Sequence, residues 1–384
     1  MTLAVDTEFI APTRPSRGSY LPYLDGIRGI AILLVIGFHA HIKQLGGGYI
    51  GVDLFFVLSG FLITSLLIKE WNRAGRVNLG HFYMRRALRL LPAVVLLLVV
   101  YVTISWFVAA DFKRVLQDAL IALFYCANWA RAVDFRLYGL GHTWSLSSEE
   151  QFYLLWPLIF IGLMLSKVPR QSLVLLLAAV AAAGWRIVMF LQGAESERIY
   201  NGLDTHADAL LVGCALAFFL VNLPEERQEK STVDGNATAP SDLAPKSLAE
   251  RGPGWILALV SAIFLLGAAV SSKFNSRAMF CVGYFAIAVA SAIVVWDLRT
   301  RPGSIARRVT EWGPLVKLGR ISYGVYLWHY PILQALVWLS KRTGQGAGWR
   351  VAMFVGGILA IYFAAELSYH FVEMPFLRLK KKFK

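Results

Sequence analysis

Charged residues and cysteines are both scarce in this 384-residue sequence. Asp, Glu, Lys and Arg make up 16% of the chain and hydrophobic residues 57%, whereas soluble domains are about a quarter charged and about half apolar. The three cysteines all lie in apolar stretches (Cys126, Cys214, Cys281), which predicts neither a disulfide framework nor a metal site. The first 20 residues are polar and lack the apolar core of a cleavable signal peptide, so none is expected.

Long apolar runs are abundant instead and recur along the whole chain. Runs of about 18–22 residues are long enough to cross a bilayer core of about 30 Å. The pattern predicts an all-α integral membrane protein with about ten transmembrane helices in one bundle, at 24–42, 49–69, 90–109, 148–166, 171–190, 204–221, 254–271, 277–297, 316–340 and 350–372. A further run, 120–129, is too short to span and predicts a re-entrant or interfacial piece.

The net charge of +14 could indicate nucleic acid, but the basic residues lie between the apolar runs, so the expected partner is the lipid bilayer and not nucleic acid. If both termini are cytoplasmic, the cytoplasmic segments collect about 25 of the 38 Lys and Arg, as the positive-inside rule requires. We therefore expect a cytoplasmic N-terminal tail (1–20), a membrane domain (21–377) with a polar cytoplasmic loop (222–253), and a basic cytoplasmic tail (378–384).

Ionisable residues inside apolar spans are costly and mark candidate functional sites. Arg28 and His39 in the first span are 11 residues apart, which puts them on one helix face about 16 Å apart along the axis. Alternatively, Arg28 pairs with Asp25 and reaches the interface. In the next span, Asp53 needs a partner, while Ser59 and Gly60 are of the size that favours close helix packing.

Three arginines, Arg85, Arg86 and Arg89, lie at one mouth of the third span. Arg86 and Arg89 are three residues apart and share a helix face. Guanidinium groups suit phosphate, although ordinary positive-inside anchoring also explains them.

Two carboxylates, Glu149 and Glu150, follow His142 and Trp144 at the start of a later span. Ser147 and Glu150 have the spacing of a helix-capping box, which would explain part of the segment structurally. Farther on, His329 falls in mid-span among aromatic residues, where it is either functional or a satisfied core histidine. Other ionisable residues in or beside the later spans are Arg186, His206, Asp208, Glu366 and Glu373.

Six segments together resemble acyltransferase family 3, a family of polytopic membrane enzymes. They are 23–28 with His39, 51–63, 82–92, 143–157, 322–331 and 370–376. The resemblance covers roughly residues 20–377 and implies a ten-helix bundle of the cytoplasmic (inner) membrane. It also implies transfer of an acyl group, most often acetyl, from cytoplasmic acyl-CoA to a hydroxyl, usually of an extracytoplasmic glycan or glycolipid.

The resemblance also assigns roles to residues. The Arg–ten residues–His pattern falls on Arg28 and His39, with the histidine catalytic, and the paired arginines fall on Arg86 and Arg89. Relatives often have an arginine near the sixth span where this chain has His206 before Asp208, which leaves the partner of Asp208 open. Relatives can also carry an esterase-like soluble domain, which we do not expect in this chain.

The resulting hypothesis is acyl transfer with acyl-CoA, most simply acetyl-CoA, as donor and with no metal. His39 would be the general base or the transient acyl carrier, and Arg28 or Ser59 would stabilise the oxyanion. The remaining expected catalytic residues are Asp53, Glu149, Glu150 and His329, and the expected cofactor-binding residues are Arg85, Arg86 and Arg89. A transporter or flippase would also bury charges, but it predicts an inverted repeat that the sequence does not show; a scaffold protein would leave the buried charges unexplained.

Overall fold

The computed structural model describes residues 20–166, 168–221, 252–343, 347–379 and 383. The expected polar loop 222–253 and the two expected tails lie largely outside these residues. Every regular element within them is helical, as predicted. The longer helices are α1 (Pro22–His39), α2 (Gly51–Ala74), α3 (Leu79–Val108), α4 (Phe112–Leu123), α6 (Thr143–Leu165), α7 (Gln171–Leu191), α10 (Asp208–Leu220), α12 (Trp255–Ser271), α13 (Tyr284–Thr300), α16 (Ser322–Thr343) and α17 (Ala347–Leu367).

Shorter elements connect or extend these helices. They are η1 (Lys43–Leu45), η2 (Gly48–Ile50), α5 (Ala127–Ala132), α8 (Ser196–Asn201), α9 (Leu203–His206), α14 (Ile305–Thr310), α15 (Gly313–Arg320), α18 (Met374–Leu379) and two π-helical turns, η3 (Met279–Gly283) and η4 (Ser368–Glu373). The short apolar run at 120–129 falls on the end of α4 and the start of α5, with a turn at Tyr125 in the left-handed region.

Within the described residues, six stretches are long and apolar enough to cross a membrane, which makes the chain a multi-pass membrane protein. They are Pro22–His39, Gly48–Ala74, Leu79–Val108, Gln171–Leu191, Met279–Thr300 and Ala352–Leu379. All six coincide with predicted spans. Two predicted spans are interrupted: 204–221 is divided between α9 and α10, and 316–340 between α15 and α16.

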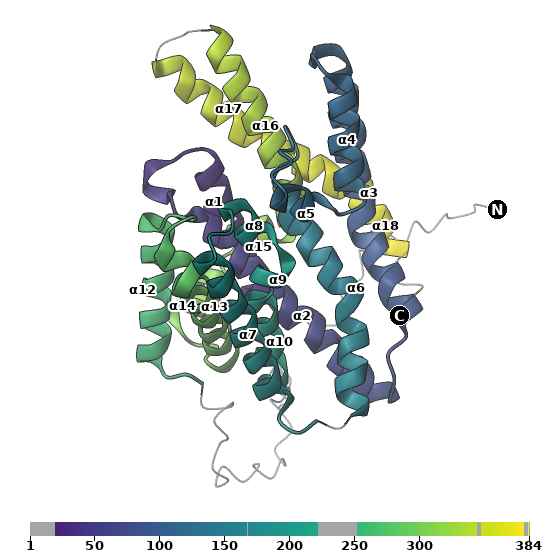
Figure 1. Cartoon of the computed structure of the whole chain (residues 1–384), viewed down its shortest axis with the longest axis vertical. Helices are drawn as coiled ribbons and strands as arrows, with labels where there is room; N and C mark the ends of the chain where they lie inside the picture. The colour runs from purple at the N-terminus through teal and green to yellow at the C-terminus, as the bar shows by residue number, and fades with distance from the viewer. Residues whose placement is uncertain (1–19, 167, 222–251, 344–346, 380–382, 384) are drawn as a thin grey trace, which may run out of the picture.

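The first two long helices form the centre of the bundle. Most residues in the spans of α1 and α2 are buried, whereas most in those of α3 and α7 are half-buried or exposed. Figure 1 shows α3 with α4, and α16 with α17, reaching past the other helices at the same end of the molecule. A bilayer can solvate such apolar outer faces, which water would not.

Helix α2 packs directly against α10 through glycines. A methyl group added at Gly60 would overlap the backbone carbonyl of Leu210, and one added at Gly213 would overlap that of Val57. This contact confirms the interpretation of Gly60 as a packing residue and brings the two backbones together, as small residues do in membrane helices. The adjacent Ser59 is not part of this contact and lines a cavity instead.

Candidate active site

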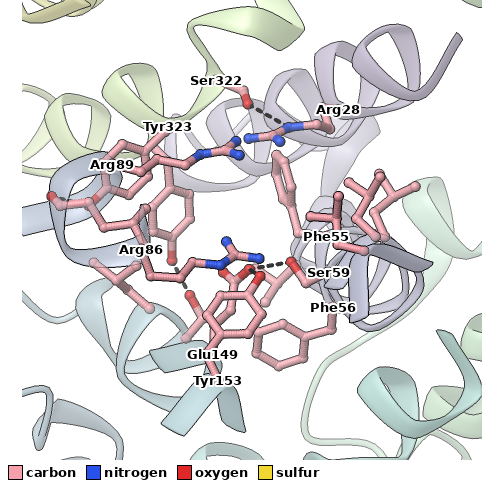
Figure 2. A pocket seen from close by; sticks show the side chains of 18 residues that line it. Arg28, Phe55, Phe56, Ser59, Arg86, Arg89, Glu149, Tyr153, Ser322 and Tyr323 are labelled. Atoms are coloured by element: carbon pink, nitrogen blue, oxygen red, sulfur yellow. Dashed lines mark hydrogen bonds between the residues drawn. The ribbon is translucent and has the colours of Figure 1, made fainter. Parts of the chain in front are cut away.

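A cavity of about 160 Å³ opens among α1, α2, α3, α6 and α16. Figure 2 shows Arg28 from α1 and Arg89 from α3 pointing toward one another on one side, with Arg86, Glu149 and Ser59 on the other. Aliphatic and aromatic side chains complete the wall, among them Phe55 and Phe56 of α2. The cavity therefore has cationic groups on both sides, one carboxylate, and apolar side chains between them.

Two of the three arginines of the cavity, Arg28 and Arg86, contact neutral groups. The Arg28 Nε donates to the Ser322 hydroxyl at 3.2 Å, and the Arg86 guanidinium lies 4.0 Å from the centre of the Tyr153 ring. Among the described residues, no ion pair links Arg28, Arg86 or Arg89 to a carboxylate. The alternative in which Arg28 pairs with Asp25 is wrong, since the Asp25 carboxylate accepts from the Tyr20 hydroxyl at 2.8 Å. The cations remain free to bind an anion.

The expected arginine triplet does not act as one group. Arg86 and Arg89 share a helix face and both line the cavity. Arg85 is directed elsewhere: its Nη2 lies 3.1 Å from the Glu70 carboxylate and its Nη1 donates to the Phe383 carbonyl at 2.8 Å. The structure therefore places two of the three predicted cofactor-binding arginines in the cavity and the third outside it.

The expected capping box at Ser147 and Glu150 is wrong. Helix α6 already begins at Thr143, so both residues lie within its first turns. The Ser147 hydroxyl donates to the Thr143 carbonyl and accepts from the Ala127 amide at 3.2 Å. Glu150 does not line the cavity, and its Oε1 is buried without a hydrogen bond in the described part of the chain.

Glu149 is the acidic residue of the cavity wall. Its Oε1 accepts hydrogen bonds from the Ser59 and Tyr153 hydroxyls. The Ser59 proton is thereby committed to the carboxylate, so Ser59 can stabilise an oxyanion only by leaving Glu149. Arg28 has no such commitment to a charged group.

Three histidines from three helices gather at the far end of α1. The His39 ring centre lies 5.0 Å from that of His329, and His142 lies 5.3 Å from His329. The His142 ring stacks on Tyr330 at 5.1 Å. His142, the residue directly before α6, was not among the predicted catalytic residues. Sequence spacing does not show that α1, α6 and α16 converge.

Hydrogen bonds determine which ring nitrogens of His39 and His329 carry a proton. The Nδ1 of His329 lies 2.6 Å from the Tyr326 carbonyl and must donate to it, which leaves Nε2 as an acceptor. That Nε2 lies 3.3 Å from the His39 Nδ1, which also lies 3.0 Å from the Val35 carbonyl. His39 therefore carries its proton on Nδ1 and keeps the Nε2 lone pair available, the arrangement that a general base needs.

The segment that leads into His142 is anchored by charged groups. Arg131 donates to the Gly141 carbonyl at 3.1 Å and pairs with Glu197 at 2.7 Å. Asp118 of α4 accepts from the Tyr138 amide at 2.8 Å. Burial raises the pKa of the Asp118 carboxyl, although this amide and Arg114 act in the opposite direction. These contacts fix the position of the histidine at the start of α6.

Asp53 lies outside the cavity in a buried charge network. Its Oδ1 lies 2.9 Å from the His206 Nε2, so the predicted need for a partner is met by a residue 153 positions away. The partner of Asp208 that the sequence left open is Arg186, at 2.9 Å. Arg186 also donates to the Phe280 carbonyl at 3.0 Å, in the π-helical turn η3. The two pairs join α2 to α9 and α7 to α10.

Comparisons with known proteins find relatives over nearly the whole chain. A family model described as an acyltransferase domain matches residues 21–368. The chain is 34% identical over 376 residues to the O-acetyltransferase OatA of Staphylococcus aureus strain NCTC 8325, covering 95% of this chain and 58% of that protein. It is 34% identical over 375 residues to the peptidoglycan O-acetyltransferase OatA of Listeria monocytogenes, covering 94% and 56%. No solved structure matches.

Proposed function

Because the chain belongs to acyltransferase family 3 and is an enzyme that transfers acyl groups, we propose that its donor is acyl-CoA and its acceptor a carbohydrate hydroxyl. The carrying observation is that a cavity lined by Arg28, Arg86 and Arg89 lies beside a histidine with a free ring nitrogen. CoA has phosphates at one end and a reactive thioester at the other. Arginines bind phosphates through charge-assisted hydrogen bonds, so Arg86 and Arg89 would hold that end.

The proposed reaction uses His39 as general base. Its Nε2 removes the proton of the acceptor hydroxyl as that oxygen attacks the thioester carbonyl carbon. Attack gives a tetrahedral oxyanion, which Arg28 is not placed to stabilise, because it lies about 16 Å from His39 along α1 and points toward Arg89 at the phosphate end of the donor. The C–S bond then breaks, the acyl group stays on the acceptor oxygen, and the proton passes from His39 to the departing CoA sulfur. His329 accepts from the His39 Nδ1–H throughout and positions the ring.

The acceptor is proposed from the relatives. Both are named O-acetyltransferases, and the Listeria protein acts, by its name, on peptidoglycan. The chain spans less than three fifths of the length of each. We therefore propose acetyl as the acyl group and a peptidoglycan hydroxyl as the acceptor, with the glycan on the side of the membrane opposite the CoA.

We further propose ten membrane spans with both ends on the cytoplasmic side of the inner membrane. Helices α6 and α16 contain 23 and 22 residues, or about 33–35 Å, which is enough to cross a bilayer even though their polar residues keep them outside the six apolar spans. The shorter apolar helices α10 and α12 complete the set. Reporter fusions at the loop after α7 and at the C-terminus test this topology.

The proposed donor and base are tested with purified protein in proteoliposomes supplied with acetyl-CoA labelled in the acetyl group. We expect label to pass to added peptidoglycan fragments and to be lost in His39→Ala. His370→Ala is the matched control, because His370 is exposed and pairs with Glu366 at 3.2 Å, away from the cavity. Wild-type rates of transfer by folded His39→Ala would rule out the base, and no transfer by the wild type would rule out this donor and acceptor.

A further inference from the structure

The arginine cavity and the histidine cluster share one side chain, Tyr326 of α16. Its ring lines the cavity. The same ring lies 5.3 Å from His329 and 5.5 Å from His142, measured between ring centres. Neither of these histidines, nor His39, lines the cavity. The Tyr326 side chain therefore lies between the arginine cavity and the histidine cluster.

The Tyr326 hydroxyl is fixed to the start of α6. It donates to the His142 carbonyl at 2.7 Å and shares a hydrogen bond of 2.5 Å with the Ser145 hydroxyl. Ser145 also lines the cavity. The ring is thus attached at both ends, through its backbone on α16 and through its hydroxyl on α6, and it bridges the gap between these two helices.

We propose that Tyr326 is a partition between the donor cavity and the histidine cluster, which swings aside during transfer and otherwise keeps water from the thioester. The inference rests on the proposed acyl-CoA chemistry. A thioester beside a general base is open to hydrolysis: a water oxygen attacks the carbonyl carbon, the C–S bond breaks, and acetate and CoA thiol leave. Closed sites suppress such side reactions by excluding water.

The tyrosine is suited to this task because its attachment is reversible. Breaking the two hydroxyl contacts frees the side chain without disturbing a charge, and the hydroxyl can bind water or acceptor meanwhile. The backbone carbonyl of Tyr326 stays bonded to His329. Movement of the Tyr326 ring would therefore leave the hydrogen bonds of His329, to the Tyr326 carbonyl and to His39, in place.

The test is release of CoA thiol from acetyl-CoA by purified protein without any acceptor, read with a thiol reagent, beside transfer measured with peptidoglycan fragments. Tyr326→Ala is expected to raise acceptor-free release about tenfold over wild type and to lower the fraction of acetyl groups that reach the acceptor. Tyr323→Ala is the matched comparison: it removes the same ring from the same cavity, but its hydroxyl is bonded to the Leu90 carbonyl of α3.

A larger increase in Tyr326→Ala than in Tyr323→Ala supports the partition. Equal increases would show a general effect of enlarging the cavity and would overturn it, as would unchanged release in a Tyr326→Ala protein that still transfers. If Tyr326→Ala does not fold, Tyr326→Phe loses only the two hydroxyl contacts and should still raise release; wild-type release in this variant would then refute the proposal. No CoA release by the wild type, with or without acceptor, would instead refute the proposed function.

Discussion

Replacing Arg89 with alanine is expected to weaken CoA binding by about 1.5–3 kcal/mol, the usual range for a hydrogen bond to a charged group. That range corresponds to about a 10- to 150-fold increase in Kd. Arg89 and Arg28 point toward one another on one side of the cavity, and neither is paired with a carboxylate among the described residues. Removing one of several like charges relieves repulsion, so the variant should fold at least as stably as wild type without ligand.

The measurement is isothermal titration of CoA into detergent-purified protein at low and high salt. CoA carries the donor's phosphates but no acyl group, so binding is measured apart from catalysis. Raising the salt should weaken wild-type binding more than that of Arg89→Ala, because a phosphate–cation contact at an open cavity is screened by ions. Arg89→Lys should recover part of the affinity, since the charge remains but the two-pronged geometry does not.

Arg85→Ala provides the matched control on the same helix. Its guanidinium is occupied by Glu70 and the Phe383 carbonyl, so CoA affinity should stay at the wild-type value. Wild-type CoA affinity in both Arg89→Ala and Arg85→Ala would refute the reasoning and leave membrane anchoring as the role of both. Equal losses in the two variants would mean that the whole basic mouth attracts CoA without a defined phosphate site.

Three other predictions concern the base, the helix contact and the buried charges. His39→Gln should lower kcat in acetyl transfer at least about 100-fold, the usual contribution of a positioned base, while CoA affinity stays unchanged; a matching loss of affinity would place His39 in binding. Gly60→Val should reduce the yield of folded protein on gel filtration, because its side chain meets the Leu210 backbone, and a normal yield would contradict the close contact. Arg186→Ala should cost about 3–5 kcal/mol by leaving a buried carboxylate unpaired, and adding Asp208→Ala should recover part of the lost thermal stability; additive losses would argue against the pair.

The helical class and the residues of single helices were predictable from the sequence, because a helix fixes its own geometry. Arg86 and Arg89 share a face and do line one cavity. The same geometry points Arg85 away from the cavity. This could have been predicted from the spacing, but the three arginines were grouped because they are the same residue type. Helical periodicity thus decides which neighbours act together.

Contacts between helices could not be predicted in this way. The partner of Asp53 is His206, and His39 meets His329 from the other end of the chain. These pairs depend on how α1, α2, α9 and α16 are placed by packing across many residues. The capping box failed for a related reason: the chain before Thr143 is held by Arg131 and Asp118, so the helix starts one turn earlier than its own sequence signal suggests.

The close contact between α2 and α10 constrains how the cavity can open. Their backbones meet at Gly60 and Gly213, and a joint without intervening side chains has little room to slide. Ser59, one position from the joint, therefore belongs to an immobile wall. Widening that admits a substrate is therefore expected at the other helices that line the cavity, α1, α3, α6 and α16, and not at α2.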